Sequence, residues 1–137
     1  MKRLSLFIYF FLITVLQAAA QQSFDKTAVK SVMKRVADWQ IANPNKGAEH
    51  DDLDWTHAAL YMGMLDWAEL TEKEDSDDSY YQWLLRIGQR NHFQIGKWMY
   101  HADFIAVGQP FIDLYLKYGN KKMIAPVMAR ANWVVSG

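Results

Sequence analysis

Two stretches of this 137-residue chain are apolar around nearly their whole circumference when they are drawn as helices. In the first, residues 53–70, one apolar stripe is supplemented by further apolar side chains on the remaining surface: Trp55, Ala58, Ala59, Met62 and Leu65, then Leu60, Tyr61, Met64, Trp67 and Ala68. The second, residues 103–118, has the same character, from Phe104 to Leu116. A helix that is apolar on all sides must be buried on several sides. Any fold for this chain therefore has to cover two such helices.

Three other segments, residues 24–41, 79–91 and 121–135, have a single apolar face and a polar or basic opposite face. Half-buried and fully buried helices thus alternate along the chain, and no stretch shows the two-residue alternation of a strand. This order predicts an all-α fold of about five helices with outer and inner layers, either a double-layered (α/α) toroid or a helical solenoid. The spacing from Trp55 to Asp103 corresponds to one helix pair.

The predicted helices are separated by recognisable boundary signals. Ser23 is a candidate N-terminal cap, residues 43–47 form a turn, acidic residues 72–78 indicate a solvated loop, and Gly119 is a stop signal. Pro110 should either kink the fourth helix or define its true first turn. A closed toroid needs about twice as many helices, because a short arc leaves its inner helices uncovered at the sides. We therefore expect an N-terminal portion of a larger toroid, or a second chain that completes it.

The first twenty residues have the pattern of a secretory signal peptide. Lys2 and Arg3 precede an apolar run, and small residues lead to a predicted cleavage after Ala20. The predicted domains are thus a signal peptide, residues 1–20, and a helical domain, residues 21–137. The compartment expected is the periplasm or the cell exterior, with no membrane association after cleavage.

Charge and cysteine content restrict the function classes. The whole chain has 15 basic and 15 acidic residues, so loss of Lys2 and Arg3 leaves the remainder faintly acidic. No basic field favours nucleic acid or anionic lipid as a partner. The chain has no cysteine, so packing or a partner has to stabilise it. Six tryptophans suit either a core or a sugar-binding cleft, and of these Trp39, Trp67 and Trp83 are predicted core residues.

Polar and aromatic residues gather at the starts of both inner helices. The second helix is preceded or opened by Asp54, Trp55, Thr56 and His57, and the fourth by Trp98, Tyr100, His101 and Asp103, with Gln109 following. In alternating hairpins the inner helices run parallel, so we expect both groups at one rim. Rings stack on sugar faces, and carboxyl groups bind hydroxyls or transfer protons. This combination favours an oligosaccharide site.

Simpler interpretations of the same residues stay open. Asp54 or Asp103 can serve only as an N-terminal cap, and Asp51 and Asp52 are predicted to be solvated loop acids. His57 suits a hydrogen-bonded structural histidine. A metal site from His50, Asp54 and His57 fits in spacing, but no further ligand is evident, so no metal or cofactor is predicted.

Short motifs in these two groups resemble a known family. They are Asp54-Trp55-Thr56-His57-Ala58-Ala59-Leu60-Tyr61-Met62-Gly63, then Tyr100-His101-Ala102-Asp103, then Ala106-Val107-Gly108-Gln109. In order and spacing they are similar to the N-terminal third of the unsaturated rhamnogalacturonyl and glucuronyl hydrolases, glycoside hydrolase families 105 and 88. That resemblance implies a six-hairpin (α/α)6 toroid, of which this chain would be a part.

The resemblance also implies a reaction. Its substrates are oligosaccharides with a non-reducing unsaturated uronic acid, here galacturonyl-rhamnose products of pectin, and water adds across the C4=C5 bond. By position, Asp103 would contact substrate and assist catalysis, and Trp55 and Thr56 would bind substrate. The principal proton-donating Asp of the family lies after the third hairpin, beyond this sequence, so we expect no activity from this chain alone. A non-catalytic carbohydrate-binding or protein-interaction module is the alternative.

Overall fold

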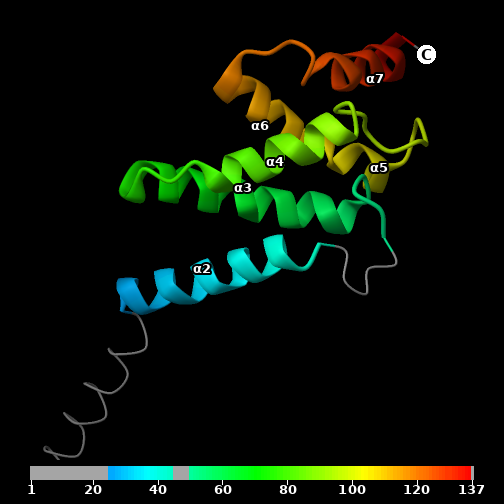
Figure 1. Ribbon diagram of the computed structural model, residues 1–137. Helices are drawn as coiled ribbons and strands as arrows, with labels where there is room; N and C mark the ends of the chain where they lie inside the picture. Colours follow the sequence, from blue (N-terminus) through cyan, green and yellow to red (C-terminus); the bar gives the residue numbers. More distant parts are fainter. Residues whose placement is uncertain (1–24, 45–49, 137) are drawn as a thin grey trace, which may run out of the picture. The chain divides into compact units, whose positions relative to one another are not determined.

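The computed structural model describes residues 25–44 and 50–136, and these form helices joined by turns and loops, without a strand among them (Figure 1). The chain divides into two compact units, residues 1–40 and 41–137, which are described separately. The predicted signal peptide and the predicted cap Ser23 lie outside the described residues. The all-α fold class predicted from the sequence is confirmed.

The first predicted helix is α2, Lys26–Ala42. Its cap is Asp25, whose carboxylate accepts a 2.8 Å hydrogen bond from the amide of Ala28. The apolar face remains open, with Val36 63% and Trp39 56% exposed. The prediction that Trp39 is a core residue is therefore wrong. In the described part of its unit, α2 has no other element to pack against.

The second predicted helix is α3, Trp55–Asp75, which extends beyond its predicted end. Residues 72–75, predicted as part of a solvated loop, continue the helix. It ends at Ser76, which adopts the left-handed conformation with φ +57° and donates its amide to the carbonyl of Thr71. The Thr71 hydroxyl is itself buried and bonded to the carbonyl of Trp67 at 3.1 Å. These hydrogen bonds end the helix at Ser76, within the acidic stretch that had been predicted to be a loop.

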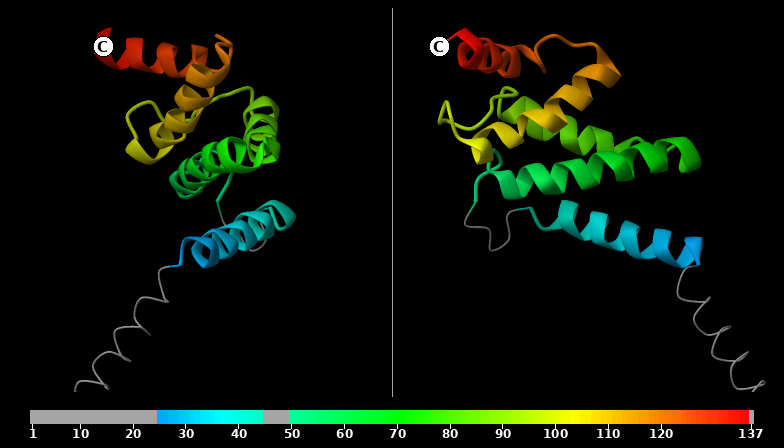
Figure 2. Two further views of the ribbon diagram at one scale, coloured as in Figure 1. Left: turned by 90° about the vertical axis from the view of Figure 1, so that its left-hand side faces the viewer. Right: turned by 180° about the vertical axis from the view of Figure 1, so that it is seen from behind.

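Helix α4, Ser79–Arg90, runs back along α3, and the two form an antiparallel hairpin (Figures 1 and 2). Edge-to-face ring pairs cross this contact, Trp67 with Tyr80 at 5.8 Å and Tyr61 with Trp83 at 5.9 Å between centroids. Such pairs add roughly 0.5–1.5 kcal/mol beyond the burial of their area. Trp67 is buried, as predicted, and Trp83 is partly buried.

The fourth predicted helix is divided into α5, Ala102–Ala106, and α6, Gly108–Tyr118. Val107, which is fully buried, ends the first and begins the second. Pro110 lies in the first turn of α6, where its missing amide hydrogen costs no hydrogen bond. Of the two outcomes predicted for Pro110, it therefore defines a first turn. Gly119, with φ +70°, ends α6 as predicted.

Helix α3 is the centre of the second unit, because α4, α5 and α6 all pack against it. The largest fully buried side chains come from these helices and their junction: Tyr61, Tyr80, Val107, Pro110, Phe111 and Leu114. Helix α3 is nevertheless open along one stripe, at Ala59, Gly63 and Asp66. The prediction of an inner helix covered on several sides is confirmed, and this side is left uncovered by the other described helices of the same unit.

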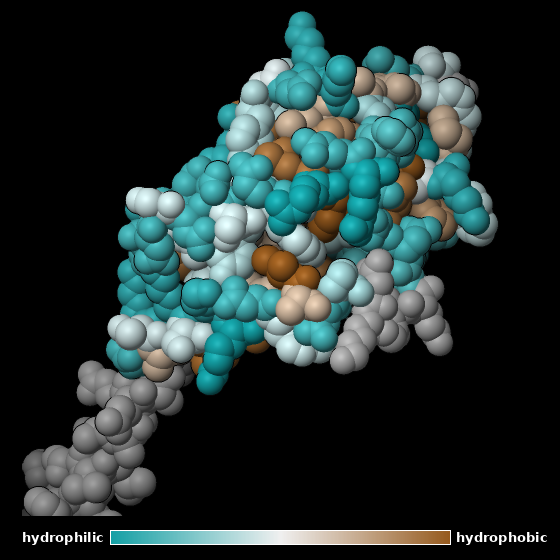
Figure 3. Space-filling view, in the orientation of Figure 1, coloured by the Kyte–Doolittle hydropathy of each residue, from teal (hydrophilic) through white to brown (hydrophobic). Residues whose placement is uncertain are grey.

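The last helix, α7, Ala125–Ser136, has no fully buried residue, although Met123 just before it is buried. Its apolar residues include Trp133, 42% exposed, and Val135, 88% exposed. On the face drawn in Figure 3, apolar side chains appear as separate patches between hydrophilic ones. None of the described helices is both long enough and apolar enough to span a membrane.

Candidate functional site

Asp54 caps the start of α3. One carboxylate oxygen accepts hydrogen bonds from both the amide and the hydroxyl of Thr56, each 3.0 Å long. The other oxygen lies 3.3 Å from Nδ1 of His50. The hydrogen bond from the backbone amide of Thr56 is the main cause that lowers the pKa of Asp54, and desolvation opposes it. The Thr56 hydroxyl and His50 lower the pKa further by smaller amounts. Asp54 and Thr56, both predicted to bind substrate, are therefore joined to each other in a helix cap.

Trp55 and His57 follow on the first turn and differ sharply in exposure. The indole of Trp55 is 50% exposed, which leaves a ring face available to a ligand. His57 is only 8% exposed, and its ring lies against Tyr61, 5.8 Å between centroids. Its Nδ1 has no hydrogen-bond partner among the described residues. His57 was interpreted as a hydrogen-bonded structural histidine, but its Nδ1 makes no such hydrogen bond to the described residues.

The second group of predicted site residues belongs to the loop before α5, residues 96–101, which we call the aromatic loop. Its central ring, Trp98, is 55% exposed and contacts the rings of His101 and Phe104, each 5.2 Å away between centroids. His101 and Phe104 also contact each other at 5.1 Å. Three rings therefore form one cluster beside the start of α5, with the indole partly open to solvent.

Asp103 lies in the first turn of α5, and its carboxylate is largely open. Its side chain is 53% exposed, and Oδ2 is 3.8 Å from Nδ1 of His101, too long for a hydrogen bond. That His101 nitrogen is buried and lacks a hydrogen-bond partner among the described residues. Gln109, the remaining predicted residue, is exposed and donates to Asp113 at 3.3 Å within α6.

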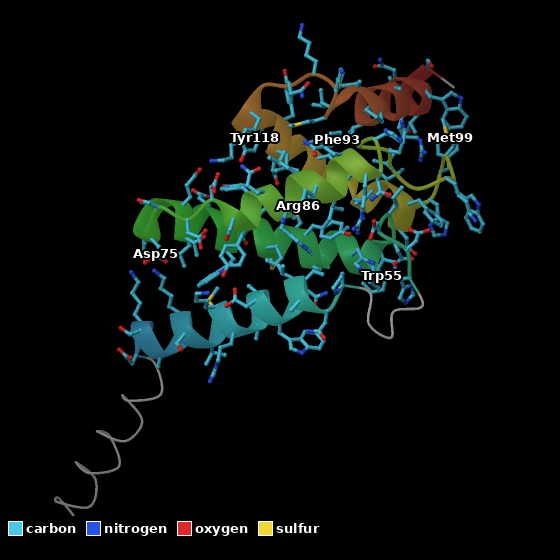
Figure 4. All side chains as sticks on the ribbon, viewed as in Figure 1. Trp55, Asp75, Arg86, Phe93, Met99 and Tyr118 are labelled. Atoms are coloured by element: carbon cyan, nitrogen blue, oxygen red, sulfur yellow. The ribbon has the colours of Figure 1, made fainter. Side chains whose placement is uncertain are left out.

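The two groups occur at the same end of α3. Helix α5 packs against α3, and the ribbon views place it beside the N-terminal part of that helix (Figures 1 and 2). In Figure 4, Trp55 and Met99 lie at the end of the unit opposite to Asp75. The arrangement expected from parallel inner helices is therefore present at the level of the helices, since α6 also runs in the same direction as α3.

A neighbouring network was missed by the sequence reasoning. Asp52, predicted as a solvated acid, has a side chain only 13% exposed and accepts two 2.7 Å hydrogen bonds from Arg90 and one from Asn91. The bond to Asp52 raises the pKa of Arg90. An open hollow of ≈ 340 Å³ borders this network. The prediction that Asp52 is a solvated acid is therefore wrong. Its partners lie 38 and 39 residues away in the sequence, where local patterns do not reveal them.

Arg130, a residue of α7 that was not among the predicted site residues, contacts the aromatic loop. Its guanidinium donates to the carbonyl oxygens of Gly96 and Trp98, both at 2.7 Å, and of Met99 at 3.4 Å. No local signal in the sequence indicates this contact, which joins residues more than thirty positions apart. It connects α7 to the loop that carries Trp98.

His50, Asp54 and His57, considered above as metal ligands, do not come together in the structure. Across residues 25–44 and 50–136, no three His, Cys, Asp or Glu side chains come together in a way that would hold a metal ion. His50 pairs with Asp54, whereas His57 is buried against Tyr61.

The fold defines a class, all-α proteins built from helical hairpins, here with polar and aromatic residues at two helix starts. A family model, Glycosyl Hydrolase Family 88, matches residues 13–137, nearly the whole chain. The chain belongs to glycosyl hydrolase family 88, and its helices are those of a partial (α/α) toroid. No curated protein and no solved structure was found to match the chain.

Proposed function

We propose that this chain forms the exported, substrate-binding part of a hydrolase for unsaturated galacturonyl-rhamnose oligosaccharides derived from pectin. Membership of glycosyl hydrolase family 88 supports a carbohydrate substrate. The observation that carries the proposal is the packing of α5 on α3, which sets the start of α3 and the aromatic loop at one end of the unit. The finer substrate follows from the motif resemblance given above.

The exposed rings supply the binding surface in this proposal. Trp55 and Trp98, half exposed each, offer flat faces to the apolar side of a sugar ring. His101 lies beside Trp98, and the exposed carboxylate of Asp103, 3.8 Å from His101, can hydrogen-bond sugar hydroxyls. The C4=C5 bond flattens the uronic acid ring, so an unsaturated sugar stacks more closely than a saturated one.

The proposed reaction is the addition of water to the C4=C5 double bond. An acid gives a proton to C4, and the positive charge that develops at C5 is shared by the ring oxygen. A water molecule adds at C5 and loses a proton to a base. The hemiketal opens with cleavage of the C5–O5 bond, and the resulting hemiacetal at C1 releases the rhamnose-containing product. The double bond receives the proton, unlike in two-carboxylate glycoside hydrolysis.

We propose that Asp103 assists this reaction and that the described residues alone do not complete it. A carboxyl that keeps its proton near neutral pH needs a desolvated environment. The Asp103 side chain is 53% exposed, and its Oδ2 lies 3.8 Å from Nδ1 of His101, so it is not desolvated by the described residues. A further acid, from the same toroid or from a second chain, would supply the proton to C4.

Binding and turnover measurements on the chain test this proposal. Titration of tryptophan fluorescence should detect binding of unsaturated galacturonyl-rhamnose, and the same disaccharide with a saturated uronic acid should bind more weakly. Replacement Trp98→Ala should abolish the difference. The ultraviolet absorbance of the double bond should stay constant with the chain alone. Equal binding of both disaccharides would favour the alternative, a non-catalytic carbohydrate-binding module, and rapid loss of absorbance would show that Asp103 or another described acid suffices.

A further inference from the structure

Three carbonyl oxygens of the aromatic loop converge on one guanidinium group. Arg130 donates through Nη2 to Gly96 and through Nη1 to Trp98 and Met99, with the two shortest bonds at 2.7 Å. Arginine suits this arrangement, since its planar fork can bond several acceptors in fixed directions, whereas a lysine offers one nitrogen. Gly96, Trp98 and Met99 lie outside any helix, so no helical series of backbone hydrogen bonds uses their carbonyl oxygens.

A second residue of α7 contacts the same loop. The ring of Trp133 lies 4.9 Å from that of Tyr100, at an interplanar angle of 56°. Residues three apart lie on one face of a helix, so Arg130 and Trp133 approach the loop from the same side. The backbone and one ring of the loop are thus both held by α7.

The base of the loop is fixed from another direction. The amide of Gly96 donates to the carbonyl of Phe104 at 2.7 Å, while the carbonyl of Gly96 accepts from Arg130. A Cβ at Gly96 would overlap the Phe104 ring. Phe104 in turn contacts Trp98 and His101. The position of the indole therefore depends on α5 at one side and on Arg130 at the other.

We propose that Arg130 is a positioning residue for sugar binding, acting through the backbone of the aromatic loop to hold Trp98 against the ligand. The expected ligand is an unsaturated uronide, and that part rests on the function proposed above. A ring that is already placed loses little conformational freedom when a ligand stacks on it. Without the guanidinium, the loop has to be ordered during binding, and affinity falls.

The test uses the full chain labelled with 5-fluorotryptophan, in which a Trp98→Phe variant assigns the fluorine resonance of Trp98. We expect Arg130→Met to shift or broaden that resonance without ligand and to leave the buried Trp67 resonance unchanged. The dissociation constant for unsaturated galacturonyl-rhamnose should rise about tenfold, because placement of the ring is lost. Arg86→Met, at an exposed arginine of α4, is the matched control and should alter neither quantity.

Arg130→Lys carries the test if Arg130→Met fails to fold, as judged by circular dichroism. The single ammonium nitrogen of lysine cannot occupy the positions of both Nη1 and Nη2, so an intermediate weakening is expected, with the native fold kept. An unchanged Trp98 resonance and unchanged affinity in a folded Arg130 variant would overturn the inference. If the native chain binds no unsaturated disaccharide while the Trp98 resonance still responds to Arg130, the proposed function fails and the loop-positioning role stands.

Discussion

Arg90 binds the carboxylate of Asp52 through two parallel hydrogen bonds, Nε to Oδ2 and Nη2 to Oδ1, each 2.7 Å long. This pair joins the turn before α3 to the last turn of α4. Asn91 adds a third bond to the same carboxylate, also 2.7 Å. The start of α3, where the candidate site begins, is thereby fixed to the end of the helix that pairs with it.

Replacement Arg90→Met should destabilise the chain by about 1–3 kcal/mol, because it leaves the mostly buried Asp52 carboxylate with fewer partners. Urea unfolding followed by circular dichroism measures this change. The control Arg86→Met, at an exposed position of the same helix, should stay within roughly 0.5 kcal/mol of the native chain. Equal losses in the two variants would mean that the Asp52 pair contributes nothing specific.

Asp54 should make the stability depend on pH in the acidic range. The hydrogen bond from the Thr56 amide lowers the pKa of Asp54 in the folded chain. The ionised Asp54 carboxylate therefore stabilises the fold fully above the pKa that Asp has in the unfolded chain, about 4. That stabilisation is lost as the pH falls through the lower folded value. We expect Asp54→Ala to cost about 0.5–2 kcal/mol at pH 7 and progressively less below about pH 4. Urea unfolding across this range measures it.

The variant Asp54→Asn separates charge from capping. Asparagine is also a good N-terminal cap, so the helix keeps a side-chain acceptor that does not titrate. The difference in unfolding free energy between Asp54→Asn and the native chain should therefore equal the contribution of the Asp54 charge. It should disappear in acid, where Asp54 is protonated. A difference between Asp54→Ala and the native chain that stays constant from pH 7 to strong acid would contradict the assignment.

Two glycines should respond to alanine in opposite directions. At Gly63, in the middle of α3, an added Cβ meets nothing within 4 Å, so Gly63→Ala should stabilise the helix by about 0.5–1 kcal/mol. At Gly96 the same atom would overlap the Phe104 ring, so Gly96→Ala should destabilise by about 1–3 kcal/mol. Thermal unfolding of both variants measures this. A loss at Gly63 would mean that another segment packs on that stripe of α3.

Export should remove the first twenty residues. Lys2, Arg3 and the apolar run before Ala20 predict cleavage that leaves Gln21 at the amino terminus. Intact-mass measurement of the chain recovered from the periplasm or medium checks this, and replacement Ala20→Arg should block the cleavage. A chain that stays in the cell with Met1 retained would contradict the predicted compartment.

Local patterns in the sequence predicted the helices well, because each depends on neighbours a few residues away. Gly119 ends α6 as expected, and Pro110 marks its first turn. Pro110 predicted a kink or a new first turn, whereas the uninterrupted apolar pattern of residues 103–118 gave no sign of a separate helix ending at Val107. Helices α5 and α6 both pack against α3 and also against each other, and these contacts between distant residues are not visible in the local apolar pattern.

The candidate site was predictable in its residue types and not in its contacts. Asp54 as a cap with Thr56 follows from helix chemistry, and Trp55 and Trp98 are both about half exposed, as a stacking role requires. The Asp52–Arg90 pair and the Arg130 contacts join positions that are distant in the sequence. The sequence around an arginine does not show which distant group will accept its hydrogen bonds. The exposure of Trp39 likewise depends on what covers α2, which periodicity cannot state.

The junction at Val107 makes the aim of Asp103 adjustable. A five-residue helix is too short to be stable in water by itself, so α5 takes its direction from the side chains it lies against. Substitutions among those few contacts can turn the carboxylate while α6 and its buried face stay in place. If Asp103 contacts the substrate as proposed, a handful of substitutions at these contacts would change the sugars that the chain accepts.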